Sequence, residues 1–225
     1  MKEVLAFLRQ LRDNNTREWF TAHKDEYLNA QASFNQFTER LILGISRFDP
    51  SVSGLTAKDC TYRIYRDVRF SKDKSPYKVH MGAYVCPGGK KSGHAGYYFH
   101  VGPGGGEGYP YEHMLASGDY CYDPKVLKIL REDICYGNGD FEAALHQAPD
   151  FVLDTDSMLR RVPDGLPQDS PYADYLRLRN FSLLHVPDDD FMLAPDLAER
   201  ATELFRTTYP FIRYVNRAVD YVKEN

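Results

Sequence analysis

The stretch TYRIYRDVRFSKDKSPYKVHMGAYV, residues 61–85, decides the fold class that the sequence predicts. Apolar and polar side chains alternate over 62–70 and again over 79–85, which is the period of a β-strand. The cluster SKDKSP at 71–76 lies between the two runs and is typical of a turn. Because a parallel crossover needs a much longer connection, the stretch predicts a hairpin of two antiparallel strands.

Strand patterns continue beyond the hairpin. Two more runs alternate at 96–101 and near 113–121, and glycine-rich turns at 87–93 and 102–110 separate the strands. A last strand is expected at 181–186, and the sequence leaves its place at the edge or in the centre of the sheet open. The sequence therefore predicts a central antiparallel sheet of about four to six strands, from roughly 60–122 and from 181–186.

Helical periodicity lies on both sides of these strands. Apolar residues keep helical spacing over 2–12 and then from Trp19 to Phe48, after a capping box predicted from Asn15 and Glu18. The second series predicts one long N-terminal helix. Further helices are expected at 124–134, 141–146, 172–178, from Pro195 to about Thr207, and from Pro210 onward. Helices packed on a run of antiparallel strands indicate an α+β fold, and the length favours a single domain, 1–225.

Composition limits the classes of protein that fit. Hydrophobic residues make up 43% and aromatic residues 14%, enough for a packed core, and the net charge of −4 argues against a general coat for polyanions. The N-terminal MKEVLAFLRQLRDNN lacks the apolar run of a secretory signal, and no window reaches the roughly 18 apolar residues of a membrane span. The four cysteines are widely spaced. We therefore expect a cytoplasmic protein with no membrane partner.

Positive charge is concentrated in the hairpin. Residues 61–80 contain six basic and two acidic side chains, a local balance of +4 in an acidic chain. Alternation places Arg66 on the apolar face of its strand, where a guanidinium requires a carboxylate or a bound anion beside it. A small anionic ligand, such as a phosphate, is therefore a predicted partner. The predicted ligand-binding residues are Arg63, Arg66, Arg69, Lys74, Tyr77 and Lys78.

Three functions fit these residues, and the sequence leaves them open. The first is an enzyme acting on a phosphate-bearing or other anionic substrate, with Asp67 and Asp73 as candidate catalytic bases. Neighbouring cations would keep the pKa of either carboxyl low, which weakens it as a base. The second is a nucleic-acid or nucleotide binding module with weak, salt-dependent affinity. The third is a structural or interaction protein whose charged hairpin is an internal salt-bridge network.

Other motifs are discounted. GPGGGEGYP at 102–110 does not satisfy G-x-G-x-x-G in any register, and GGKKS lacks the upstream glycine of a phosphate-binding loop. Four histidines fall within the strand region, but their spacing matches no common metal-ligand pattern. The sequence therefore assigns no metal site and identifies no cofactor. These histidines are His80, His94, His100 and His113.

The string RIYRDVRFSKDKSPYK at 63–78 resembles the signature of the family known as domain of unknown function 2461, an RxxRDxRF…DKxPY-type motif. NNTREWF at 14–20, LRRVPDGLPQDSP at 159–171 and YPFIRYVNRA near the C-terminus also resemble segments of that family. The resemblance covers most of the chain. It implies that the charged stretch is a feature shared within the family, and it implies no particular activity. The positions that match the central motif are Arg63, Arg66, Asp67, Arg69, Phe70, Asp73, Lys74 and Tyr77.

Overall fold

The computed structural model describes residues 1–103 and 113–225 and confirms the predicted α+β class. The helices are α1 (Lys2–Asp13), α2 (Arg17–Ala22), α3 (Lys24–Ser46), α4 (Ala57–Cys60), α5 (Pro124–Tyr136), α6 (Asp140–His146), α7 (Ala173–Leu176), α8 (Asp189–Leu193) and α9 (Leu197–Glu224), with a 3-10 turn η1 (Pro50–Val52). The strands are β1 (Met81–Val85), β2 (Gly96–Val101), β3 (His113–Asp119), β4 (Val152–Leu153) and β5 (Phe181–His185).

The described strands form one antiparallel sheet in the order β1-β2-β3-β5-β4. The first three strands are neighbours in sequence and pair as the short turns predict. The expected strand at 181–186 corresponds to β5, and it lies inside the sheet because the two-residue strand β4, which the sequence did not indicate, pairs with its other side. Most of the predicted turn at 102–110 lies outside the described residues.

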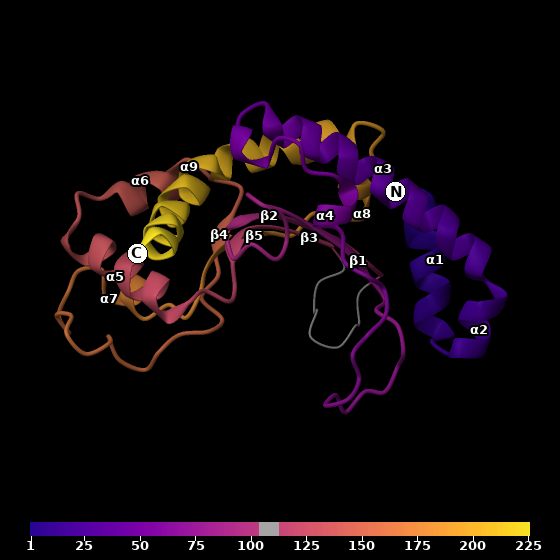
Figure 1. The fold of residues 1–225 in the computed structure, drawn as a ribbon, viewed down its shortest axis with the longest axis horizontal. Helices are drawn as coiled ribbons and strands as arrows, with labels where there is room; N and C mark the ends of the chain where they lie inside the picture. Colours follow the sequence, from indigo (N-terminus) through magenta and orange to yellow (C-terminus); the bar gives the residue numbers. More distant parts are fainter. Residues whose placement is uncertain (104–112) are drawn as a thin grey trace.

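One face of the sheet packs against helices. Figure 1 shows α3 and α9 spanning this face, while the segment 61–80 extends from the opposite side of the molecule. Alternate residues of the strands, such as Phe99 and Leu115, point toward these helices and are fully buried. The ring of Phe99 lies 4.4 Å from that of Phe37 in α3, and Tyr97 lies 5.5 Å from Phe205 in α9. Apolar burial at this face supplies the main driving force for the fold.

The other face of the sheet is more polar. The register places Gly82, His100 and Met114 side by side on it, with Tyr98 and Ala116 in the adjacent row. Met114, Ala116 and Tyr98 are only partly buried, in contrast to the residues that face the helices. A Cβ at position 82 would come within 2.7 Å of the Tyr98 hydroxyl, so glycine lets this ring lie across the strand. This face carries the candidate site.

The predicted long N-terminal helix is wrong in one respect: it is divided into α2 and α3 at His23. His23 has φ −111° and ψ 25°, and its ring stacks on Trp19 at 4.1 Å. The capping box assigned to Asn15 and Glu18 is also wrong. Thr16 caps α2 instead, by accepting a hydrogen bond from the backbone N–H of Trp19. Because Thr16 provides the cap, the Asn15 side chain bonds to the hairpin instead.

The two predicted C-terminal helices are a single helix, α9, with Pro210 inside it. Proline cannot donate the backbone hydrogen bond that a helix expects at this position, which is why the sequence predicted a break. In the preceding turns the hydroxyls of Thr207 and Thr208 bond to the carbonyls of Leu204 and Phe205. The buried apolar stripe of α9 continues across the proline, and this packing keeps the helix intact.

None of the helices in the described ranges combines the length and the apolar character that a bilayer span requires.

Candidate functional site

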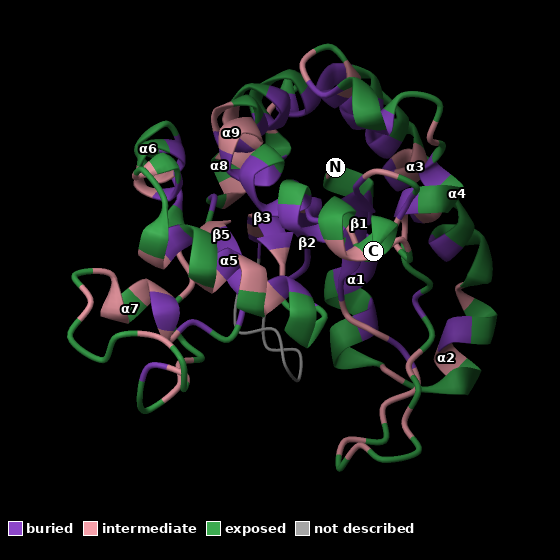
Figure 2. Ribbon diagram, turned by 60° about the vertical axis from the view of Figure 1, so that its left-hand side comes forward, coloured by how far each residue is buried: buried purple, intermediate pink, exposed green. Residues whose placement is uncertain are grey.

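The hairpin at 61–80 is held by a few bonds and is not a regular strand pair. The N–H of Tyr62 donates to Gly82 at 3.0 Å, and the N–H of Lys78 donates to Ile64 at 2.8 Å. Between residues 62 and 80 the pairing is reduced to an isolated bridge of Tyr65 with Tyr77, so the strand predicted over 62–70 is wrong. Figure 2 shows most of this segment as half-buried or exposed, below the buried sheet.

Two contacts attach the hairpin to the N-terminal helices. The Asn15 side chain clamps the backbone of Tyr77, donating to its carbonyl at 2.9 Å and accepting from its N–H at 3.2 Å. The ring of Tyr77 stacks on Phe20 of α2 at 3.9 Å and is buried. Burial raises the pKa of the Tyr77 hydroxyl. This predicted ligand residue therefore contributes its ring to the core.

The turn of the hairpin neutralises much of its own charge. Arg66 pairs with Asp73 and bonds to Ser71 at 3.2 Å. Arg69 forms a two-pronged pair with Asp67, through Nη2 at 2.7 Å and Nε at 2.9 Å. The guanidinium predicted on an apolar strand face is thus met by a carboxylate of the following turn. The same alternation would bury Phe70, but that side chain is 95% exposed, which also contradicts a regular strand.

The candidate bases Asp67 and Asp73 are held as carboxylates. Hydrogen bonds from Arg69 lower the pKa of Asp67 to about 2. Bonds from the Ser75 hydroxyl and backbone N–H, followed by Arg66, lower the pKa of Asp73 to about 2. A carboxylate with so low a pKa removes a proton from a substrate poorly at neutral pH. Both carboxylates instead stabilise the turn of the hairpin, Asp67 by binding Arg69 and Asp73 by binding Ser75 and Arg66.

Three of the predicted cationic ligand residues, two at the base of the hairpin and one in its turn, lack a carboxylate partner among the described residues. Within the described ranges, no carboxylate lies within ion-pair distance of Arg63, Lys74 or Lys78. Lys74 donates to the carbonyl of Val68 at 2.9 Å. Lys78 is half-buried, with its Nζ 5.5 Å from the centre of the Tyr62 ring. Burial and then the charge of Arg63 lower the pKa of Lys78.

Aromatic and imidazole side chains connect this base to the polar face of the sheet. Tyr62 packs edge-on against Tyr98 of β2, with ring centres 6.4 Å apart. His80 stacks on His100 at 4.4 Å, and the Tyr98 hydroxyl lies 3.0 Å from Nδ1 of His100. Burial, followed by the charges of Lys78 and Arg66, lowers the pKa of His80 to about 4. Burial also lowers the pKa of His100.

The structure therefore places the six predicted ligand residues in three different parts of the hairpin. Arg63 and Lys78 lie together at the base, Arg66, Arg69 and Lys74 lie in the turn, and Tyr77 packs against α2. Three further residues lie beside Arg63 and Lys78 that the sequence did not indicate: His80, Tyr98 and His100. Alternation in β2 indicates that Tyr98 and His100 share a face, but bringing His80 beside them depends on the β1–β2 pairing register. We call the set Arg63, Lys78, Tyr62, His80, Tyr98 and His100 the hairpin-base cluster.

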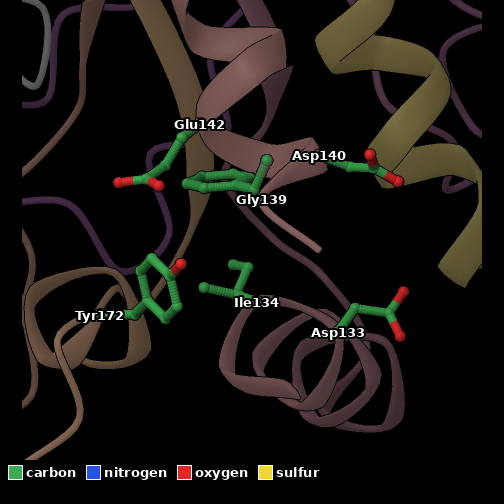
Figure 3. A pocket seen from close by; sticks show the side chains of 7 residues that line it. Asp133, Ile134, Gly139, Asp140, Glu142 and Tyr172 are labelled. Carbon is green, nitrogen blue, oxygen red and sulfur yellow. The ribbon is translucent and has the colours of Figure 1, made fainter. Parts of the chain in front are cut away.

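A separate hollow is lined by Asp133, Ile134, Gly139, Asp140, Phe141, Glu142 and Tyr172 (Figure 3). Its volume of about 10 Å³ corresponds to room for about one water molecule. Its three carboxylates would repel the anionic ligand predicted from the sequence. In the part of the chain that the structure describes, no group of three or more histidine, cysteine or acidic side chains is placed to hold a metal ion.

Comparisons with known proteins place the chain in a family. Neither the curated proteins nor the solved structures contain a match to this sequence. The model of the family described as conserved hypothetical protein, DUF2461, matches residues 3–214. This match covers most of the chain and includes the whole hairpin and the polar face of the sheet. The chain therefore belongs to the DUF2461 family.

Proposed function

We propose that the protein binds a small phosphate-bearing molecule or a similar anion at the hairpin-base cluster, with Arg63 and Lys78 as the groups that contact the anion. The observation that carries the proposal is the position of Lys78, half-buried beside Arg63, with no described carboxylate paired to either cation. Arg63 is exposed, but Lys78 is partly desolvated beside its positive charge, and this costs free energy unless an anion offsets it. A bound phosphate would supply that compensation with several acceptor oxygens.

The internal salt-bridge hypothesis accounts for only part of the hairpin. It fits Arg66 and Arg69, whose carboxylate partners lie in the same turn. It does not account for Arg63 and Lys78. The proposal therefore assigns the turn to organising the hairpin and the base to holding the ligand.

If the bound molecule undergoes a reaction, His80 is a better candidate proton acceptor than Asp67 or Asp73. Its imidazole is neutral at physiological pH, because its pKa is about 4. Burial is the main cause of this low pKa, and the charges of Lys78 and Arg66 add to it; a bound anion would offset those charges and raise the pKa. The proposal itself concerns binding and does not depend on this step.

Calorimetric titration with inorganic phosphate, nucleotides, sugar phosphates and short oligonucleotides at constant ionic strength tests the proposal. Arg63→Gln and Lys78→Met should each weaken phosphate binding about tenfold or more, because each removes a charge-assisted contact. Arg69→Gln is the matched control. It removes one positive charge from the same hairpin at a position that is 77% exposed and already paired, so binding should persist.

Two results would overturn the proposal: unchanged affinity in both base variants, or an equal loss of affinity in Arg69→Gln. Binding of oligonucleotides without binding of small phosphates would instead favour the nucleic-acid module. The pH dependence gives an independent check. Because burial and the charge of Arg63 lower the pKa of Lys78, affinity should start to fall with rising pH earlier than it would for an ordinary exposed lysine.

A further inference from the structure

An exposed aromatic ring lies directly beside Lys78 at the base of the hairpin. The ring belongs to Tyr62, and it is 40% exposed. The backbone that carries it is anchored to the edge of the sheet, because the N–H of Tyr62 donates to the carbonyl of Gly82 at 3.0 Å. Nζ of Lys78 lies 5.5 Å from the centre of the ring, within the range of a cation–π interaction. Tyr62 therefore presents an apolar surface to solvent next to a cation.

Tyr98 of β2 adds a second aromatic surface, steeply inclined to the first. The planes of the two rings make an angle of 69°, and their centres are 6.4 Å apart. The Tyr98 ring lies across Gly82, where a Cβ would come within 2.7 Å of its hydroxyl, and that hydroxyl lies 3.0 Å from Nδ1 of His100. These contacts fix the ring in place. We call Tyr62 and Tyr98 together the aromatic corner.

The other two tyrosines of the hairpin are placed differently. Tyr77 is buried and stacks on Phe20 at 3.9 Å, and Tyr65 packs against Tyr77 with ring centres 5.4 Å apart. Both rings therefore belong to the contact between the hairpin and α2. Of the four tyrosines between residues 61 and 80, Tyr62 is the one whose ring contacts Lys78. A phosphate that Lys78 contacts would bring the group esterified to it next to this ring.

We infer that the anion held at the hairpin-base cluster is the phosphate of a nucleoside monophosphate, whose base packs in the aromatic corner; the inference rests on the proposed function. A flat ring that stacks on Tyr62 meets Tyr98 edge-on, and both arrangements are favourable for aromatic groups. Stacking on an aromatic side chain adds affinity for any of the bases, since each has a π-face. The corner thus selects a nucleotide over a sugar phosphate.

Calorimetric titration of the full chain with inorganic phosphate, ribose 5-phosphate and adenosine monophosphate tests the inference at constant ionic strength and pH. Adenosine monophosphate should bind about tenfold more tightly than ribose 5-phosphate, because it adds a stacked base to the same phosphate. Tyr62→Leu keeps an apolar side chain and removes the stacking surface, so the ratio of these two affinities should fall to near unity. Since the ratio is taken within one variant, a change in the position of Lys78 affects both ligands alike.

Tyr65→Leu is the matched control. It removes a tyrosine of the same hairpin that is 48% exposed and packs against Phe20 and Tyr77, so the ratio should stay as in the wild type. In NMR spectra of the wild type, the ring-proton signals of Tyr62 should move upfield with adenosine monophosphate and not with ribose 5-phosphate, because a stacked base shields them.

The possible results separate this inference from the proposed function. If phosphate and ribose 5-phosphate bind and adenosine monophosphate binds no more tightly, the inference is overturned and the proposed function stands. The inference is also overturned if Tyr62→Leu keeps the wild-type ratio, since the base would then lie elsewhere. If none of the three ligands binds, the proposed function is overturned and the inference with it.

Discussion

Acidification should destabilise the protein through His80, and the size of the effect follows from its environment. The imidazole is buried against His100, and this burial, followed by the charges of Lys78 and Arg66, lowers its pKa from 6.5 to about 4. In the unfolded chain the same group keeps its ordinary pKa. Between pH 6.5 and pH 4 the unfolded state therefore binds more protons than the folded state, and the free energy of unfolding falls as the pH falls.

The magnitude follows from this difference in pKa. One unit of pKa is worth about 1.4 kcal/mol, so His80 should cost the folded state about 2 kcal/mol at pH 5 and about 3 kcal/mol at pH 4. Protonation of Asp67 and Asp73 does not obscure the effect of His80 on the free energy of unfolding. Their folded pKa values of about 2 lie below the ordinary 3.8 of an aspartate, so the stability that they contribute is lost mainly as the pH falls from 3.8 toward 2.

Urea unfolding of the wild type and of His80→Phe, measured from pH 7 to pH 4, separates the contribution of His80 from that of the other titrating groups. Phenylalanine keeps an aromatic ring against His100 and removes the titrating group. The wild type should lose about 2 kcal/mol more than the variant between pH 7 and pH 5. His146→Phe, at an exposed position of α6, is the matched control and should show the pH dependence of the wild type.

A parallel pH dependence in the wild type and His80→Phe would refute the reasoning. So would an NMR titration that places the pKa of His80 near 6.5 in the folded protein. The same titration connects the prediction to the proposed function. Phosphate bound at the hairpin base should raise the pKa of His80 above about 4, because it offsets the charge of Lys78.

Three further outcomes are expected. Asn15→Ala removes both bonds to the Tyr77 backbone and should lower the free energy of unfolding by about 1–3 kcal/mol in urea titrations, whereas an unchanged value would mean that water replaces the clamp. Gly118→Ala should destabilise the protein by at least about 2 kcal/mol or prevent folding, because φ is +125° there and a Cβ would collide with the carbonyl of Phe181 on β5. Soluble protein of unchanged melting temperature would contradict this. The predicted single domain should unfold in one calorimetric transition, and two resolved transitions would argue for two domains.

Local sequence patterns determined the fold class and the location of the charge. Alternating side chains on either side of SKDKSP predicted a hairpin of two strands, but only isolated antiparallel bridges form there, and regular pairing begins at β1. The ion pair of Asp67 with Arg69 can be predicted from the sequence, because residues only two positions apart always lie near each other. The same patterns failed at His23 and Pro210, where packing overrode the local preference for one long helix and for a break.

The composition of the candidate site was decided by the tertiary structure. Whether a given cation is paired depends on which carboxylate the fold brings to it: Asp73 reaches Arg66, while no described carboxylate pairs with Arg63. His80 meets His100 only because of the register between β1 and β2, and a shift of one residue would place the His100 ring on the other face. Such contacts between distant residues depend on how the whole hydrophobic core packs. A short stretch of sequence does not contain that information.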